Sequence, residues 1–239
     1  MTHTLLLRLA GPMQSWGTQS HFSRRDTGLE PSKSGVVGLL CAALGRPRDQ
    51  PMDDLAALRM GVRVDCEGVL QMDYHTVGAV ARGTESHYGV ASFNGGHRPV
   101  LSRRAYLASA SFLVGLEGAT RSQEELLRQL DVALAHPVWP LYLGRKAFPP
   151  AGPVRLPDAP PHGPGLRAGA VRDALLQYPW PADRDQPLRF ILEDVDGSSG
   201  ETRQDTPVSF LPLNRRYAPR FVTTEFHSRP ATTIALDVL

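Results

Sequence analysis

The sequence predicts an α+β protein with a ferredoxin-like βαββαβ core over residues 1–149 and a smaller β-rich part after it. An apolar run of strand length opens the chain, and further apolar segments follow in the order helix, strand, strand, helix. A stretch rich in proline and glycine, residues 149–168, then separates this core from the rest. With 239 residues, the chain is long enough for one large domain or two small ones.

The first strand is expected from Thr4 to Leu9, in the interior of a sheet, because it is apolar on both faces. Gly11-Pro12 is a strong turn signal that ends it. A polar, basic loop then leads to an apolar helix over Gly35–Leu44, with a serine of Pro31–Ser34 as its N-cap. A solvated connection is one interpretation of this loop, but such long loops in compact domains are usually functional.

A short second helix is expected from Asp49 to about Arg59. Strands at Val62–Cys66 and Val69–Tyr74 should follow, joined by a tight turn at Glu67-Gly68. Regular patterning then stops until Arg104, over about thirty residues with little acid. We interpret this region, about 75–105, as a projecting basic hairpin or arm, with a disordered insertion as the alternative.

Apolar side chains alternate from Tyr106 to Leu116, which predicts one strand. Ser122–Glu125 matches a capping box and should open an amphipathic helix that stops before Pro137. A strand or turn within Leu141–Phe148 would complete the βαββαβ unit.

Weaker signals follow the proline-rich stretch, and we assign residues 150–239 to a C-terminal extension packed on the core. They predict a short helix over Ala170–Tyr178, a strand over Phe190–Val195, a turn over Asp194–Gly200 and a final apolar alternation over Thr233–Leu239.

Composition is that of an ordinary globular protein, with 41% hydrophobic and 21% charged residues. No apolar run approaches the roughly 18 residues of a membrane helix, and the N-terminus lacks a signal-peptide pattern. Cys41 and Cys66 have no spacing typical of a metal site, so we expect free thiols in a reducing compartment. These features predict a cytoplasmic protein with no membrane contact, metal or cofactor.

The net charge of +2 hides strong segregation along the chain. Residues 1–48 carry six basic and two acidic side chains, residues 74–106 carry four and one, and residues 173–206 carry three and eight. Of the 26 basic residues 24 are arginine, which suits bidentate phosphate contacts and stacking on bases. A polyanion is therefore the expected partner, although codon usage in a GC-rich genome and chance would also give this pattern.

Aromatic side chains next to basic or amide side chains fit the binding of single-stranded RNA. Trp16 lies in the basic loop, and the start of the following helix at Lys33 is a candidate seat for a phosphate. Taken singly, an aromatic residue is more often part of the core, and an exposed basic pair is usually just solvated. The candidate RNA-binding residues are Gln14, Trp16, Gly17, Arg24, Arg25, Lys33, Ser34, Tyr74, His75, Arg103, Arg104, Tyr106, Arg145 and Lys146.

Catalysis has less support. A metal-independent ribonuclease needs a general base and a cation for the developing charge, and His21, Tyr74, His75 and Lys33 contain those groups. The sequence does not bring them together, and it has neither a carboxylate cluster for two metals nor a nucleophile motif. We therefore expect a non-catalytic binder, with an endoribonuclease and a stand-alone single-strand binder as alternatives.

Several stretches resemble the CasD family, the RAMP-superfamily subunits of type I-E CRISPR Cascade. They are RLAGPMQSWG from Arg8, TGLEPSKSGVVGLLCAALGRPRDQ from Thr27, DYHTV from Asp73, RRAYLASASFLVGL from Arg103 and YLGRKAFP from Tyr142. The resemblance is specific in the first fifty residues, continues to Pro149 and is weak after Pro150.

This resemblance implies an RRM-like RAMP core with a projecting thumb, which would be the arm. It implies a subunit that grips the 5′ handle of the CRISPR RNA (crRNA) and caps one end of the backbone filament. The implied partners are the crRNA handle, the neighbouring backbone subunit, the large subunit that recognises the PAM and, through the complex, target DNA. Relatives of another subtype cut precursor RNA with a Tyr/His/Lys set that has no positional match here.

Overall fold

The computed structural model describes residues 1–17, 24–80, 87–88, 90–91, 97–98, 100–160, 163–182, 186–194, 197, 200–230 and 235–236. The helices are α1 (Lys33–Leu44), α2 (Asp53–Ala56), α3 (Arg121–Ala135) and α4 (Val171–Gln177). The strands up to the arm are β1 (His3–Ala10), β2 (Met13–Gln14), β3 (Arg24–Arg25), β4 (Arg59–Cys66) and β5 (Val69–Val77). Those of the arm tip and its return are β6 (Ala79–Val80), β7 (His87–Tyr88), β8 (Val90–Ala91), β9 (His97–Arg98) and β10 (Val100–Ala108). The remaining strands are β11 (Ser111–Gly118), β12 (Leu166–Ala168), β13 (Trp180–Pro181), β14 (Leu188–Asp194), β15 (Glu201–Ser209), β16 (Arg216–His227) and β17 (Ala235–Leu236).

A seven-stranded antiparallel sheet with the order β12-β1-β11-β4-β14-β16-β15 organises the molecule. Helix α1 lies between β1 and β4 in the chain, and α3 between β11 and β12. The predicted mixed α and β composition is therefore confirmed. The segment Leu141–Phe148 forms a turn, and β12 from beyond the proline-rich stretch pairs with β1 instead. Of the strands after residue 150, β12, β14, β15 and β16 belong to the same sheet, whereas β13 and β17 pair with each other. The division into two parts stays a prediction.

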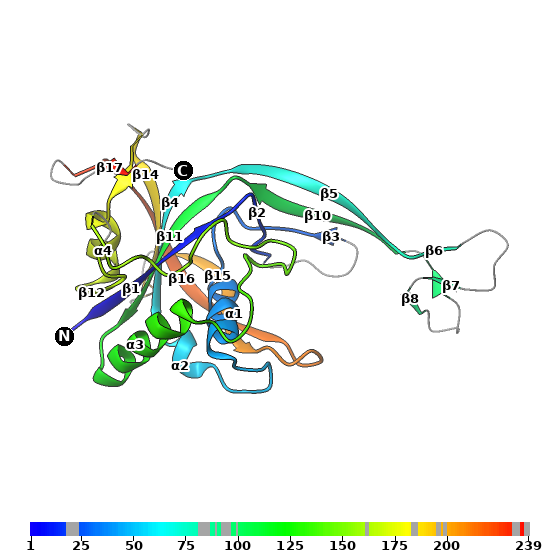
Figure 1. The fold of residues 1–239 in the computed structure, drawn as a ribbon, viewed down its shortest axis with the longest axis horizontal. Coiled ribbons are helices and arrows are strands. Elements are labelled where there is room, and N and C mark those ends of the chain that lie inside the picture. Colours follow the sequence, from blue (N-terminus) through cyan, green and yellow to red (C-terminus); the bar gives the residue numbers. More distant parts are fainter. Residues whose placement is uncertain are drawn as a thin grey trace.

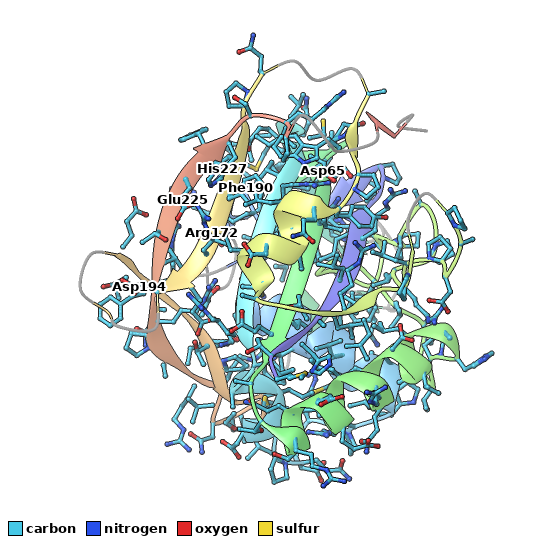
Figure 2. The ribbon with its side chains drawn as sticks, turned by 90° about the vertical axis from the view of Figure 1, so that its left-hand side faces the viewer. Asp65, Arg172, Phe190, Asp194, Glu225 and His227 are labelled. Carbon is cyan, nitrogen blue, oxygen red and sulfur yellow. The ribbon has the colours of Figure 1, made fainter. Side chains whose placement is uncertain are left out.

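Both faces of this sheet carry a core, as the uninterrupted apolar run of β1 predicts. Leu5, Leu7 and Leu9 face the side of α1 and α3, whereas Leu6 faces α4, and all four are fully buried. Figure 2 shows the face that carries α4, where Arg172 Nε donates to Glu225 Oε2 at 3.1 Å.

The arm leaves this sheet as a long pair of strands, β5 and β10, which are matched from Val69↔Ala108 to Val100↔Val77. Figure 1 shows the pair running away from the seven-stranded sheet toward the short strands β6, β7 and β8. The strands on both sides are longer than predicted, because regular strand continues to Val77 and resumes at Val100. The bounds of the arm, about 75–105, stay a prediction. The ends of β5 and β10 are held as strands by pairing with each other, and they lack the apolar alternation of a half-buried strand by which a sequence reveals one.

The single strand predicted from Tyr106 to Leu116 is two strands. β10 ends at Ala108 and β11 begins at Ser111, with Ser109 between them at a φ of 55°. The chain passes here from the arm into the seven-stranded sheet, and the alternation happens to continue across the break. Sequence periodicity does not show a change of sheet.

The helix starts differ from prediction by a few residues. Ser32 is the N-cap of α1 and accepts a hydrogen bond from Gly35 N at 3.3 Å. For α3, the capping box is formed by Thr120 and Gln123 rather than by Ser122–Glu125. The second helix is a single turn, since the chain joins β4 from Arg59 onward.

Within the described residues, no helix is long and apolar enough to span a membrane. The same residues contain no group of three or more His, Cys, Asp or Glu side chains placed to hold a metal ion.

Candidate nucleic-acid interface

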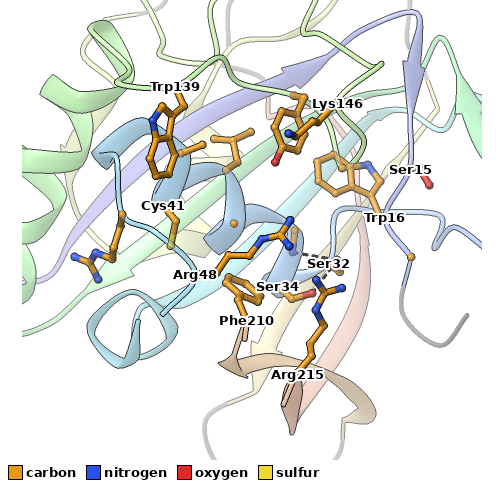
Figure 3. Close-up of a pocket in the computed structure, with 18 of the residues that line it drawn as sticks. Ser15, Trp16, Ser32, Ser34, Cys41, Arg48, Trp139, Lys146, Phe210 and Arg215 are labelled. Atoms are coloured by element: carbon orange, nitrogen blue, oxygen red, sulfur yellow. Dashed lines mark hydrogen bonds between the residues drawn. The ribbon is translucent and has the colours of Figure 1, made fainter. Parts of the chain in front are cut away.

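A groove of about 1040 Å³ runs along α1, and we call it the α1 groove. The small residues Gly35, Gly38 and Ala42 of α1 line it, so the helix backbone comes close to its surface. The turn over residues 139–146 supplies one wall, and Phe210, Arg215 and Tyr217 supply the other (Figure 3). Aromatic rings border this helix face, because a Cβ at Gly35 would lie 2.8 Å from the Trp16 ring and one at Gly38 would lie 4.0 Å from the Phe210 ring.

The groove is cationic. Arg46, Arg48, Lys146 and Arg215 line it, and among its described lining residues none is acidic. Arg46 is bonded to Asp54 outside the groove at 2.6 and 2.9 Å, whereas Arg48, Lys146 and Arg215 are exposed. Figure 3 shows the side chains of Arg48 and Arg215 pointing toward the start of α1. Cations gathered in a concave surface favour an anionic ligand.

Aromatic rings accompany these cations. Trp139 is 43% exposed and is held against the end of α1, because its backbone N donates to Ala42 O at 3.1 Å. Tyr142, Phe210 and Tyr217 are half-buried around the same groove. Aromatic faces beside basic side chains are the combination that stacks bases and contacts phosphates.

Gly144 lets the turn that carries Lys146 approach the chain after β2. Its φ is +86°, and a Cβ there would lie 1.8 Å from Ser15 O. Ser15 N donates to Leu143 O at 3.1 Å and completes the contact. Only glycine permits this approach without a local shift.

One face of the arm presents a row of exposed side chains across three strands. Arg103 on β10 is paired with Tyr74 on β5 and with Arg24 on β3, so the three side chains share a face. Tyr74 is 60% exposed, and both arginines are exposed. The structure thus brings together three of the residues selected from the sequence.

The other face of the arm carries the next row, in which Arg104 is paired with Asp73 and with Arg25. Arg145 reaches this row and donates to Ala105 O at 2.9 Å. Burial, and then the nearby charge of Arg104, lower the pKa of Arg145.

His75 and Tyr106 also lie on this second face. Nδ1 of His75 is 3.3 Å from Asp73 Oδ2. Tyr106 packs against Phe148 with ring centroids 5.9 Å apart, which leaves it half-buried.

Lys33 corrects the sequence-based expectation of a phosphate seat. Its side chain is 3% exposed, and its Nζ lies 2.9 and 3.0 Å from the carboxylate oxygens of Glu193. Its backbone N donates to Asp205 Oδ2 at 2.8 Å, so a carboxylate of the chain already occupies the helix start. Burial lowers the pKa of Lys33, and Glu193 partly offsets this effect.

Trp16 and Gln14 are also internal. Trp16 is 1% exposed, and its Nε1 donates to Gln14 Oε1 at 3.2 Å. Gln14 in turn donates to Leu9 O at 3.1 Å and to Ala110 O at 2.7 Å. This burial fits the alternative in which Trp16 is a residue of the hydrophobic core rather than a stacking platform for RNA. Of this loop, the exposed Gly17 and the half-buried Ser34 line the α1 groove, and the buried Trp16 borders it as well.

The ribonuclease set does not assemble in the described part of the chain. Lys33 is buried in an ion pair, and Tyr74 and His75, being neighbours on a strand, point to opposite faces. His21 lies outside the described residues.

The groove also contains residues that sequence reasoning did not select, chiefly Arg46, Arg48, Trp139, Tyr142 and Arg215. Two basic residues directly after the end of a helix, in Gly45–Arg48, were a usable signal for Arg46 and Arg48. Nothing local indicates that Arg215, far along the chain, returns to α1.

Comparison with known proteins gives the family of this chain. The model of the family described as CRISPR-associated protein (Cas_Cas5) matches residues 4–223, and the chain belongs to this family.

Individual relatives narrow the class further. The chain is 34% identical over 237 residues to the CRISPR system Cascade subunit CasD of Escherichia coli (strain K12), covering 92% of this chain and 94% of the relative. It also matches a chain of a solved CRISPR RNA-guided surveillance complex with a TM-score of 0.79 and 32% identity, over 98% and 94% of the two chains. A solved structure described as a Cas protein matches with a TM-score of 0.71 and 41% identity, over 95% of each chain.

Proposed function

We propose that this chain is a non-catalytic RNA-binding subunit of a Cascade-type CRISPR effector complex, and that it grips the 5′ handle of the crRNA. The observation that carries the proposal is the α1 groove, where three exposed cations and an exposed tryptophan surround a helix face of small residues. Stacking on Trp139 and phosphate contacts to Arg48, Lys146 and Arg215 would hold a single strand there.

The arm supplies a second contact in this proposal. Tyr74, Arg103 and Arg24 form a continuous exposed row that suits a phosphate backbone and one stacked base. The handle would run from the α1 groove to this row.

A further part of the proposal concerns topology and partners. The order β12-β1-β11-β4, with α1 and α3 as the connecting helices, supports a ferredoxin-like βαββαβ core. In the complex, this subunit would cap the backbone next to the PAM-recognising large subunit and would meet target DNA only through its partners. Its similarity to a Cascade subunit and to a chain of an RNA-guided surveillance complex supports this placement.

Filling the groove tests the proposal. A Cβ at Gly38 would meet only ring carbons of Phe210, at 4.0 Å, so the helix accepts a Cβ there and a longer side chain fills the groove beside Phe210. Gly38→Leu should weaken binding of labelled repeat-derived handle RNA by about tenfold or more, which corresponds to loss of a stacked base. Gly38→Ala is the matched control and should bind as the parent protein does.

Gly38→Ala should melt no lower than the parent, since glycine costs about 1 kcal/mol relative to alanine inside a helix. The RNA affinity of Gly38→Leu is expressed per folded molecule. Unchanged RNA affinity in a folded Gly38→Leu protein would exclude the groove as the RNA site. Incubation with labelled repeat RNA in EDTA tests the non-catalytic part of the proposal. Site-specific cleavage that is lost in His75→Ala would establish the endoribonuclease alternative.

A further inference from the structure

A buried network of four charged side chains joins the start of α1 to the last three long strands. Asp205 on β15 accepts hydrogen bonds from Arg220 Nε at 2.6 Å and from Arg220 Nη2 at 3.0 Å. The same carboxylate accepts from the backbone N of Lys33 at 2.8 Å. Lys33 Nζ is paired with Glu193 on β14, whose Oε2 also accepts from Met60 N at 3.0 Å.

This network is internal and electrically balanced. The side chains of Lys33, Asp205 and Arg220 are 3%, 5% and 7% exposed, and that of Glu193 is 17% exposed. Two positive and two negative charges are therefore held away from water, which is costly unless every partner stays in place. Such a network tolerates little displacement of the elements that carry its members.

The elements that carry this network are those that build the α1 groove. Ser32, Ser34 and Gly35 flank Lys33 and line the groove at the start of α1. Phe210 directly follows β15, the strand of Asp205. Arg215 directly precedes β16, the strand of Arg220, and Tyr217 is the second residue of that strand. The two sides of the groove are thus connected behind its surface through Asp205.

We propose that Asp205 is a positioning residue for RNA binding, and that with Arg220, Lys33 and Glu193 it fixes the separation between α1 and the opposite wall of the α1 groove. This inference rests on the proposed function, since the ligand is the handle RNA of that proposal. None of the four side chains contacts the ligand. They act by holding Arg215 and Phe210 at the distance from α1 at which a base and its phosphate fit together.

Asp205→Asn tests the proposal because it removes one charge and keeps the shape of the side chain. Asp131→Asn is the matched control, since Asp131 is 19% exposed and is paired at 2.8 Å with Arg155, on a side of the molecule that does not line the groove. At a temperature where both variants are folded, Asp205→Asn should weaken handle-RNA binding by about 2–30-fold. Asp131→Asn should leave the affinity unchanged.

The separation of the walls is measured directly with spin labels at Ser34→Cys and Arg215→Cys, in a background with Cys41→Ala and Cys66→Ser. The distance distribution between the labels should be narrow with Asp205 intact, broader with Asp205→Asn and unchanged with Asp131→Asn. Global stability alone does not move this distance. If Asp205→Asn does not fold, Lys33→Met, which breaks only the link to Glu193, serves in both measurements with the same expected direction.

Equal RNA affinity and equal distance distributions in Asp205→Asn and the parent would overturn the proposal. An affinity loss of the same size in Asp131→Asn would also overturn it, because loss of any ion pair would then lower RNA affinity through a general loss of stability. Failure of the proposed function gives a different result, in which Gly38→Leu leaves RNA affinity unchanged while the label distances still respond to Asp205→Asn.

Discussion

The two tryptophans on either side of the α1 groove should respond in opposite ways to substitution by alanine. Trp16 is 1% exposed, and Gly35 lies so close that a Cβ there would be 2.8 Å from the indole ring. Removing a buried tryptophan costs about 3–5 kcal/mol of folding free energy. For a chain of this size, that cost corresponds to a fall in melting temperature of about 6–20 °C. Trp139 is 43% exposed, so Trp139→Ala should change the melting temperature little.

RNA affinity should show the reverse order. If Trp139 stacks on a base, Trp139→Ala should lose about 1–3 kcal/mol of binding free energy, or about 5–150-fold in Kd. Trp16→Ala should stay close to the parent once affinity is expressed per folded molecule. Differential scanning calorimetry and fluorescence anisotropy with labelled handle RNA measure the two quantities. A loss of RNA affinity in Trp16→Ala at an unchanged melting temperature would refute the core role of Trp16, because its ring would then be the one that stacks on a base.

Three further predictions concern the arm, a turn and a surface ion pair. Replacing both Arg24 and Arg103 by alanine should weaken RNA binding and reduce the slope of log K against log salt by about 1.4, if each contacts one phosphate of a single strand; an unchanged slope would remove this row from the RNA path. Gly144→Ala should lower the free energy of unfolding, measured by urea titration, by about 1–3 kcal/mol or more, because its φ of +86° and the approach of Ser15 O exclude a Cβ. An unchanged free energy of unfolding would contradict the close contact between Gly144 and Ser15. The hydrogen bond from Arg46 holds the pKa of Asp54 below its ordinary value. The stabilisation that this half-exposed ion pair gives the fold is therefore fully present at a pH above the ordinary carboxyl pKa, and it is lost as the pH falls through the lowered pKa of Asp54. Urea titrations of the parent and Asp54→Asn should differ by less than about 1 kcal/mol at neutral pH and converge in acid, and a difference that persists in acid would show another cause.

The parts of the fold that the sequence predicts best are those with a local cause. The apolar run of β1 and the amphipathic pattern of α3 required only side-chain periodicity, and both elements are present within a residue or two. Glu67-Gly68 forms the predicted tight connection, with Gly68 at a φ of 71°. The break at Ser109 was missed because the pleat alternation continues through a residue that changes sheets.

The sequence predicted basic and aromatic side chains at a shared surface, but it selected only some of the residues that the structure brings together there. Tyr74, Arg103 and Arg24 share a face because β5 and β3 both pair with β10, and the first two were adjacent to recognisable strands. Trp16 and Lys33 had the expected neighbours in the sequence, yet both turn inward. Their burial depends on contacts with Gly35 and with Glu193, and the second of these is 160 positions away from Lys33.

The α1 groove is positively charged because acidic residues of the chain are paired with basic ones elsewhere. Residues 173–206 carry the strongest negative excess of the chain, and two of its members, Glu193 and Asp205, are enclosed with Lys33 and Arg220 beneath the groove. Glu30, whose side chain is 12% exposed, is likewise paired with Arg189 at 2.9 Å.

Acidic side chains that are bound internally contribute little to the outer field, whereas Arg48, Lys146 and Arg215 remain exposed. These three come from three different basic stretches of the sequence, and they lie together because α1, the turn at Gly144 and the β15–β16 connection converge. Charge segregation along the chain predicts a polyanion as partner. The buried pairing of acidic side chains with Lys33 and Arg220 is the physical reason that a chain of net charge +2 can have a cationic groove.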